Sequence, residues 1–341
     1  MAFDKMIVKK LLKKFDDVPF VVKFPDGEEF KVGEGEPQAI IRANGGIDMG
    51  AVMKSPSLAL GEAYMDKTLE LEKGDLFEIL NMVLAKLEDF ASDFSGLTKI
   101  MKTSTSKKNQ KQEIATHYDI GNEFFELWLD ETMSYSCGYF KHETDTLYDA
   151  QVHKVEHILK KLNLKEGQTL LDIGCGWGYL LIAAAKKYHV KGVGITLSEE
   201  QYKKGQERIK AEGLEGQVEI RLMDYRDLEK SGMTFDRIVS VGMLEHVSRD
   251  NYPLFFKNID KVLNKKGIVL LHYISGRQEH DGDPWIKKYI FPGGIIPSLR
   301  EIIYLIGEYN YYTLDVESLR RHYEKTLLEW SKNYAAKRDV I

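Results

Sequence analysis

The chain has 341 residues, of which 43% are hydrophobic and 30% charged, which is the balance of a folded globular protein and not of a disordered one. Its formal net charge of -5 argues against a general nucleic-acid binder, because neutralising phosphates requires a positive field over a large face. No apolar stretch approaches the length that spans a bilayer, and the lysine-rich amino-terminal segment does not resemble a signal peptide. We therefore expect a cytoplasmic protein in which both cysteines, Cys137 and Cys175, are free thiols.

Residues 1–98 are expected to form a small α+β domain. Residues 5–15 place apolar side chains among five lysines, the pattern of a basic amphipathic helix. Such a helix either touches an anionic membrane or is an ordinary surface helix docked on its own domain. Strand-like runs at 20–24 and 29–32 flank a Pro-Asp-Gly turn and predict a hairpin. Helical periodicity follows at 57–65 and 75–90.

Residues 99–112 contain almost no apolar side chain and predict a flexible linker. The second domain, residues 113–341, alternates short β-branched runs with amphipathic helices, which is typical of an α/β fold with a parallel sheet. The expected strands are 169–173, 192–196, 218–223, 237–241 and 268–274.

A glycine motif directly follows the first of these strands. The residues from Asp172 to Gly178 read D-I-G-C-G-W-G and precede a helix, so the backbone can approach a ligand at the end of the strand. The spacing is G-x-G-x-G, whereas a dinucleotide site uses G-x-G-x-x-G to place pyrophosphate at the helix start. The motif therefore favours S-adenosylmethionine over a nicotinamide dinucleotide.

Polar residues follow the second and third strands. Thr196, Ser198 and Gln201 are able to hydrogen-bond a ribose, although Ser198 also reads as a helix start, and the two roles can coexist. The residues 223–227 suit an adenine, with a plain loop as the alternative.

Several segments together resemble the cyclopropane-fatty-acyl-phospholipid synthase family, which is related to the mycolic acid cyclopropane synthases. The resemblance is close over 113–335, and the first domain resembles the amino-terminal domain of the phospholipid enzymes, which the mycolic acid enzymes lack. The family usually continues beyond the position of Ile341, so the chain looks short at this end. The segments are His117–Asn122, Met133–Cys137, the glycine motif, Gly194–Ser198, Val241–Val247, Leu271–Ile274 and Tyr289–Gly294.

The resemblance implies a Rossmann-like S-adenosylmethionine-dependent methyltransferase fold with a helical lid, and a first domain for lipid docking or dimer contact. It implies no metal site. The residues expected to contact S-adenosylmethionine are Tyr135, Ser136, Gly174, Cys175, Gly176, Thr196, Leu197, Ser198, Gln201, Tyr225 and Arg226. The residues expected around a catalytic bicarbonate are Cys137, Glu245, His272, Ile274 and Tyr323.

The implied reaction moves the methyl of S-adenosylmethionine to the cis double bond of an unsaturated phospholipid acyl chain, and a small base then removes a proton so that a cyclopropane ring closes. Bicarbonate fits the role of that base. Glu245 and His272 follow the fourth and fifth strands and converge there, although singly they read as a helix-start carboxylate and a core histidine. Tyr323 is expected to pack against apolar neighbours and to add one hydrogen bond, and Cys137 to contribute its backbone.

Residues 289–312 are rich in aliphatic and aromatic side chains, so they either line the acyl channel as a lid or form a plain core helix and strand. We expect a homodimer that associates peripherally with the inner face of the membrane, where its phospholipid substrate lies. The alternatives are a methyltransferase that closes no ring, one that methylates an amine or a hydroxyl, and a non-catalytic lipid-binding protein of the same fold. The glycine spacing disfavours a nicotinamide dehydrogenase.

Overall fold

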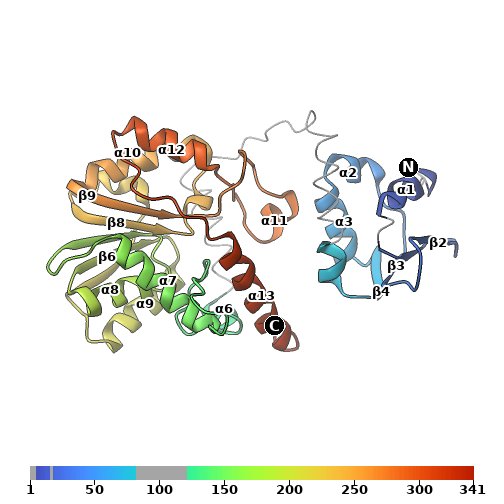
Figure 1. The fold of residues 1–341 in the computed structure, drawn as a ribbon, viewed down its shortest axis with the longest axis horizontal. Coiled ribbons are helices and arrows are strands. Elements are labelled where there is room, and N and C mark those ends of the chain that lie inside the picture. The colour runs from blue at the N-terminus through green and yellow to red at the C-terminus, as the bar shows by residue number, and fades with distance from the viewer. Residues whose placement is uncertain (1–4, 16–17, 82–120) are drawn as a thin grey trace. The chain divides into compact units, whose positions relative to one another are not determined.

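Two separate β-sheets organise the part of the chain that the computed structural model describes, residues 5–15, 18–81 and 121–341 (Figure 1). Each sheet belongs to its own unit. The first unit comprises Met1–Lys102 together with Asp283–Tyr289, and the second comprises Thr103–Gly282 and Ile290–Ile341. The predicted linker at 99–112 lies outside the described residues. Within the described ranges, no helix combines the length and the apolarity needed to cross a membrane.

The sheet of the first unit has four strands in the order β2-β1-β3-β4. The predicted hairpin is confirmed, because β1 and β2 pair antiparallel and Gly27 takes a φ of +86° in the turn between them. The sequence did not indicate β3 and β4. The strands are β1 (Phe20–Lys23), β2 (Glu29–Val32), β3 (Ala39–Ala43) and β4 (Leu69–Lys73).

The basic amphipathic helix α1 (Lys5–Leu12) packs on its own unit. Val8 and Leu12 contact the core beneath the small sheet, which includes Phe24. Lys5 and Lys9 form ion pairs with acidic residues of the β1–β2 turn region, and both ammonium groups lie within 6 Å of the Phe24 ring centroid. For these side chains, the structure favours the docked surface helix over the membrane-bound one.

The first unit also contains the helices α2 (Met49–Lys54), α3 (Pro56–Met65) and α11 (Pro284–Tyr289). Residues 76–81 are helical too, at the start of the predicted 75–90 helix, whose remainder lies outside the described residues. α11 packs on α3 so closely that a Cβ at Gly61 would clash with the Trp285 ring. The Tyr289 hydroxyl donates to Glu62 at 2.8 Å. The start of the predicted 289–312 lid is thus grouped with the first unit.

The second unit has five parallel strands in the order β7-β6-β5-β8-β9, which confirms the predicted α/β fold. The order reverses at β5, and the crevice beside such a strand is where open α/β sheets bind ligands. The strands are β5 (Thr169–Ile173), β6 (Lys191–Thr196), β7 (Val218–Leu222), β8 (Phe235–Val241) and β9 (Leu263–His272).

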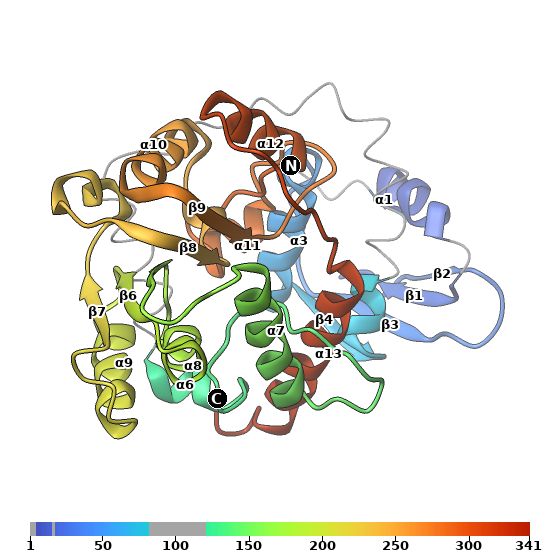
Figure 2. The same ribbon diagram turned by 60° about the vertical axis from the view of Figure 1, so that its left-hand side comes forward.

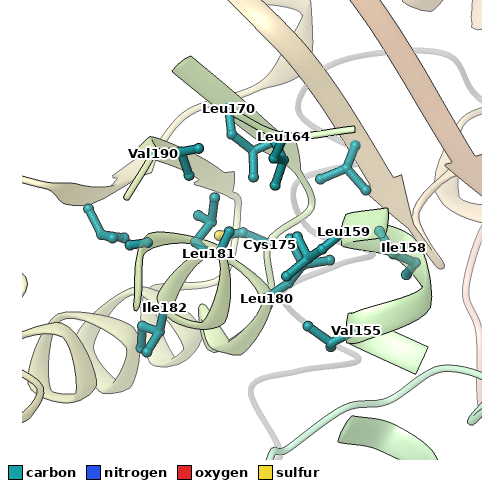
Figure 3. Packing of buried hydrophobic residues seen from close by; sticks show 14 of the residues in the cluster. Val155, Ile158, Leu159, Leu164, Leu170, Cys175, Leu180, Leu181, Ile182 and Val190 are labelled. Atoms are coloured by element: carbon teal, nitrogen blue, oxygen red, sulfur yellow. The ribbon is translucent and has the colours of Figure 1, made fainter. Parts of the chain in front are cut away.

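Helices cover both faces of this sheet because its strands are apolar on both sides (Figure 2). Leu170 packs under one face with α7 (Leu147–Lys161), α8 (Tyr179–Tyr188) and α9 (Glu199–Ala211). Figure 3 shows Leu170 and Leu181 within this cluster. Leu171 and Ile173 face the other side, against α10 (Tyr252–Val262) and α12 (Leu299–Glu308). α12 therefore matches the alternative reading of its segment, a core helix.

An aromatic cluster joins α6 (Asn122–Glu126) to α13 (Arg320–Ala336) in the same unit. Tyr323 and Trp330 of α13 lie in it with Phe125 and Trp128, as expected for the packing role of Tyr323. Leu327, which the helical period also suggests as a packing residue, is 49% exposed.

Candidate active site

The glycine motif forms a tight turn between β5 and α8. Gly174 has a φ of +82°, and a Cβ at this position would lie 2.8 Å from the Met243 side chain. Its N–H and that of Cys175 both donate to the carbonyl oxygen of Ile195, at 2.9 and 3.1 Å. Only glycine accepts both the backbone conformation and the close approach, so the first turn of the motif is fixed against the end of β6.

A pocket opens at the carboxyl ends of β5, β6, β7 and β8, beside the point where the strand order reverses. Nine of the eleven residues predicted to contact S-adenosylmethionine line it. They are Tyr135, Ser136, Gly174, Cys175, Gly176, Thr196, Leu197, Gln201 and Tyr225.

The other two predicted cofactor residues do not line this pocket. Ser198 caps α9, because its hydroxyl accepts a hydrogen bond from the Gln201 N–H at 3.3 Å. Arg226 is buried, and its guanidinium donates to the Asp224 carboxylate at 2.9 Å. The Thr196 hydroxyl donates to the Gln201 side chain at 2.8 Å, so these two predicted ribose-binding side chains already hold each other in place.

The expected lid segment reaches the pocket through Phe291. Its ring stacks on Tyr135, with ring centroids 6.0 Å apart, and lies 5.7 Å from the ring of His246. Tyr135 and His246 both line the pocket. An aromatic side chain of the 289–294 motif therefore lies next to the pocket wall.

The residues predicted to hold bicarbonate come from several elements. Glu245 lies in the short 3-10 helix Leu244–His246 after β8, and its Oε1 accepts a hydrogen bond of 2.7 Å from the Ile274 N–H. His272 is the last residue of β9. Cys137 contacts the start of α13, because its thiol donates to the Leu319 carbonyl oxygen, which also accepts the Tyr323 N–H at 2.9 Å.

Burial sets the charge of these groups. It raises the pKa of Glu245 to about 7 and lowers that of His272 to about 4, so the imidazole is neutral at physiological pH. The pKa of the Tyr323 hydroxyl is raised by burial first and then by the charges of Tyr135, Glu245 and Cys137, which places Tyr323 in the same electrostatic neighbourhood.

Two of the residues predicted to hold bicarbonate each have a buried atom without a hydrogen-bond partner, Glu245 Oε2 and His272 Nδ1. A buried polar atom left unpaired costs about 1–3 kcal/mol, so most such atoms in folded proteins have a partner. A small guest with both donor and acceptor oxygens is able to supply the bond that either atom lacks. Within the described ranges, no cluster of three metal-ligating side chains is present.

Sequence reasoning missed Lys154, which also lines the pocket. It is 4% exposed, and Asp172, the residue at the end of β5, is 3% exposed. The available signal was the position of Lys154 on the apolar stripe of α7, one turn from Gln151 and Ile158, both of which are buried. A lysine on such a stripe is rarely buried without a partner.

Comparisons with known proteins identify the family of the chain. Residues 105–341 match the family model described as mycolic acid cyclopropane synthetase, and residues 7–95 match the model of a domain of unknown function. The chain is 40% identical to a probable fatty acid methyltransferase of Pseudomonas putida over 323 residues, 93% of this chain and 81% of the relative. It is 41% identical to the cyclopropane-fatty-acyl-phospholipid synthase of Escherichia coli K12 over 308 residues, 89% of this chain and 78% of the relative.

A solved structure supports the same assignment. The mycolic acid cyclopropane synthase CmaA1, complexed with SAH and CTAB, superposes with a TM-score of 0.62 at 35% identity, over 67% of this chain and 84% of that chain. The chain therefore belongs to the mycolic acid cyclopropane synthetase family and is an S-adenosylmethionine-dependent methyltransferase.

Proposed function

We propose that the enzyme transfers the methyl group of S-adenosylmethionine to the cis double bond of an unsaturated phospholipid acyl chain and closes a cyclopropane ring with the help of bound bicarbonate. The observations that carry this proposal are that Glu245 Oε2 and His272 Nδ1 are each buried without a hydrogen-bond partner, and that the Glu245 charge acts on the Tyr323 hydroxyl. The relative from Escherichia coli, a cyclopropane-fatty-acyl-phospholipid synthase, supports the choice of substrate.

The proposed S-adenosylmethionine site is the pocket at the strand ends. Gly174 and Gly176 bring the backbone close to the ligand, and Tyr135, Ser136, Thr196, Leu197, Gln201 and Tyr225 supply the side-chain walls. Ser198 and Arg226 take part indirectly, by fixing the start of α9 and the loop after β7. These residues suit a nucleoside because glycine backbone, apolar walls and a few neutral hydrogen-bonding groups converge in one pocket.

When bound, S-adenosylmethionine supplies an electrophilic methyl group, and bicarbonate supplies a base small enough to work beside hydrocarbon. Glu245 and His272 would hold and orient the bicarbonate through their unpaired atoms, with the Tyr323 hydroxyl as a third contact. The Ile274 N–H holds the Glu245 carboxyl in place. The apolar pocket walls, among them Trp177, exclude water that would otherwise trap a cation on the acyl chain.

Cys137 contributes to this site through its position and not as a nucleophile. Burial raises the pKa of its thiol to about 11, so it is protonated at neutral pH. We expect Cys137→Ala to retain turnover within a few-fold of the wild type, measured as methyl transfer to vesicle lipid. A loss of about a thousandfold or more, as expected for a nucleophile, would contradict this reading.

A second candidate is methyl transfer to the same acyl chain without ring closure. The relative from Pseudomonas putida, a probable fatty acid methyltransferase, favours it as the alternative. The two reactions share the pocket and differ in the fate of one proton. Removal of a proton from the new methyl group leads to the ring, whereas removal of a proton from the acyl chain leaves a methyl branch beside a new double bond.

The test incubates the protein with vesicles of monounsaturated phospholipid and a deuterated methyl donor, with and without added bicarbonate. We expect labelled lipid that has lost one deuterium and shows cyclopropane proton resonances by NMR, formed faster with bicarbonate; saturated phospholipid serves as the control. Retention of all the deuterium would support the second candidate. Unlabelled lipid in every sample, from protein shown to bind S-adenosylhomocysteine, would refute both.

Membrane association and oligomeric state are also part of the proposed function. The acyl chain has to leave a bilayer to reach the pocket, so we place the enzyme peripherally at the inner face of the membrane, as a homodimer. Because the lysines at 5 and 9 are paired within their own unit, the remaining basic residues would carry attraction to anionic lipid. Sedimenting the assay vesicles at low and high salt measures this association.

A further inference from the structure

Lys154 is a charged side chain in the wall of the cofactor pocket. It is 4% exposed and lies on the buried face of α7. Lysine is almost never fully buried unless a partner satisfies its ammonium group, because burial removes the water that solvates the charge. The partners of this ammonium therefore indicate what the side chain is for.

The protein supplies only part of what the ammonium needs. Nζ donates to the Ser136 hydroxyl at 2.8 Å, which uses one of its three N–H donors. In the described ranges, Lys154 makes no ion pair within 4 Å. Asp130 and Asp172 act on it only as more distant charges, and Asp172 Oδ1 is itself buried without a hydrogen-bond partner.

The ammonium nevertheless stays largely charged at neutral pH. Burial lowers the pKa of Lys154 to about 8, while the carboxyl groups of Asp130 and Asp172 and the thiol of Cys137 oppose the decrease. A cation with spare donors in a ligand pocket is poised to bind an anion. Apart from the Asp172 carboxyl and the His246 imidazole, the other pocket walls are apolar or neutral polar side chains and glycine backbone, which cannot neutralise an anionic group on the ligand.

S-adenosylmethionine carries one anionic group, the carboxylate of its amino-acid end. We infer that Lys154 binds this carboxylate, together with the Ser136 hydroxyl that it already contacts. Because Lys154 donates to the Ser136 oxygen, the hydroxyl hydrogen of Ser136 remains free to donate to the same carboxylate. Lys154 thus fixes the amino-acid end of the methyl donor, an inference that rests on the use of S-adenosylmethionine and not on ring closure or bicarbonate.

The test compares two ligands by isothermal titration calorimetry. S-adenosylhomocysteine carries the carboxylate, whereas 5′-methylthioadenosine keeps the adenine, ribose and sulfur but lacks the amino-acid end. We expect Lys154→Met to weaken binding of S-adenosylhomocysteine by about 10- to 100-fold, the effect of one charge-assisted hydrogen bond, and to change binding of 5′-methylthioadenosine by less than about twofold. Lys160→Met, on the exposed face of the same helix, should change neither.

An equal loss for both ligands would overturn the inference, because it would mean that Lys154 only holds Ser136 and its loop in place. No loss for either ligand would overturn it as well. Decarboxylated S-adenosylhomocysteine completes a double-perturbation cycle, in which the lysine and the ligand carboxylate are removed singly and together. The wild type should bind it about 10- to 100-fold more weakly than the intact ligand, and Lys154→Met should barely distinguish the two. Should Lys154→Met not fold, Lys154→Gln takes its place with the same expectation. The assay contains neither lipid nor bicarbonate, so its result is independent of the proposed ring closure.

Discussion

Replacing Glu245 by glutamine should lower cyclopropane formation by about 100-fold or more while leaving S-adenosylhomocysteine affinity within about twofold. The amide keeps the acceptor that binds the Ile274 N–H, so the local backbone is preserved. It removes the carboxylate oxygen proposed to hold bicarbonate and puts an N–H₂ donor in its place. Product is measured by mass spectrometry of vesicle lipid, and affinity by calorimetry.

The same variant should be more stable than the wild type above neutral pH. The pKa of Glu245 is about 7 in the folded protein against 4.5 when solvated, so the folded state binds the proton more tightly. The stability that this carboxyl contributes is fully present below pH 4.5 and is lost as the pH rises through 7. At pH 8 in bicarbonate-free buffer, Glu245→Gln should gain about 2–3 kcal/mol, or several degrees in Tm, and at pH 4.5 almost nothing.

Glu143→Gln is the matched control, since Glu143 is exposed in the same unit and its replacement should alter neither activity nor Tm. A Glu245→Gln enzyme with wild-type turnover would exclude this carboxylate from the reaction. A variant inactive and less stable at every pH would show instead that the carboxyl serves the fold.

The second large effect is expected from Gly174→Ala. The change forces a φ of +82° on alanine and drives its Cβ to within 2.8 Å of the Met243 side chain, so the turn has to shift. The hydrogen bond from the N–H of residue 174 to the Ile195 carbonyl oxygen is then disturbed, and the pocket wall is displaced. We expect S-adenosylhomocysteine affinity to fall by about 100-fold or more, measured by calorimetry on protein with a native far-UV spectrum.

Gly213→Ala is the control that separates backbone strain at a positive φ from the displacement of neighbouring atoms by a new Cβ. Gly213 also has a positive φ, +65°, but a Cβ there would meet nothing within 4 Å, and the residue lies after α9, outside the pocket lining. This variant should lose about 1–2 kcal/mol of stability and keep full affinity. If both variants lose affinity alike, the tight turn at Gly174 is not what shapes the pocket.

Several elements were predictable from the sequence because their signals are local. The run from Asp172 to Gly178 contains strand end, turn and helix start within a few consecutive residues, and the structure has β5, the turn and α8 there. The hairpin of β1 and β2 was equally readable, since its turn residues lie between the two strands. Alternating apolar runs and amphipathic helices likewise fixed the parallel sheet of the second unit.

Tertiary packing alone decided the rest, because a sequence pattern shows which residues are apolar but not which distant segments meet. β3 pairs in parallel with β1 across a long connection, and α11 packs on α3 from far along the chain. The contact of Glu245 with the Ile274 N–H, 29 residues away, likewise exists only in the folded chain. Composition and spacing thus determined the fold class and the type of cofactor site. The burial of Lys154 in the pocket wall, and that of Glu245 Oε2 and His272 Nδ1 without hydrogen-bond partners, came from the three-dimensional arrangement.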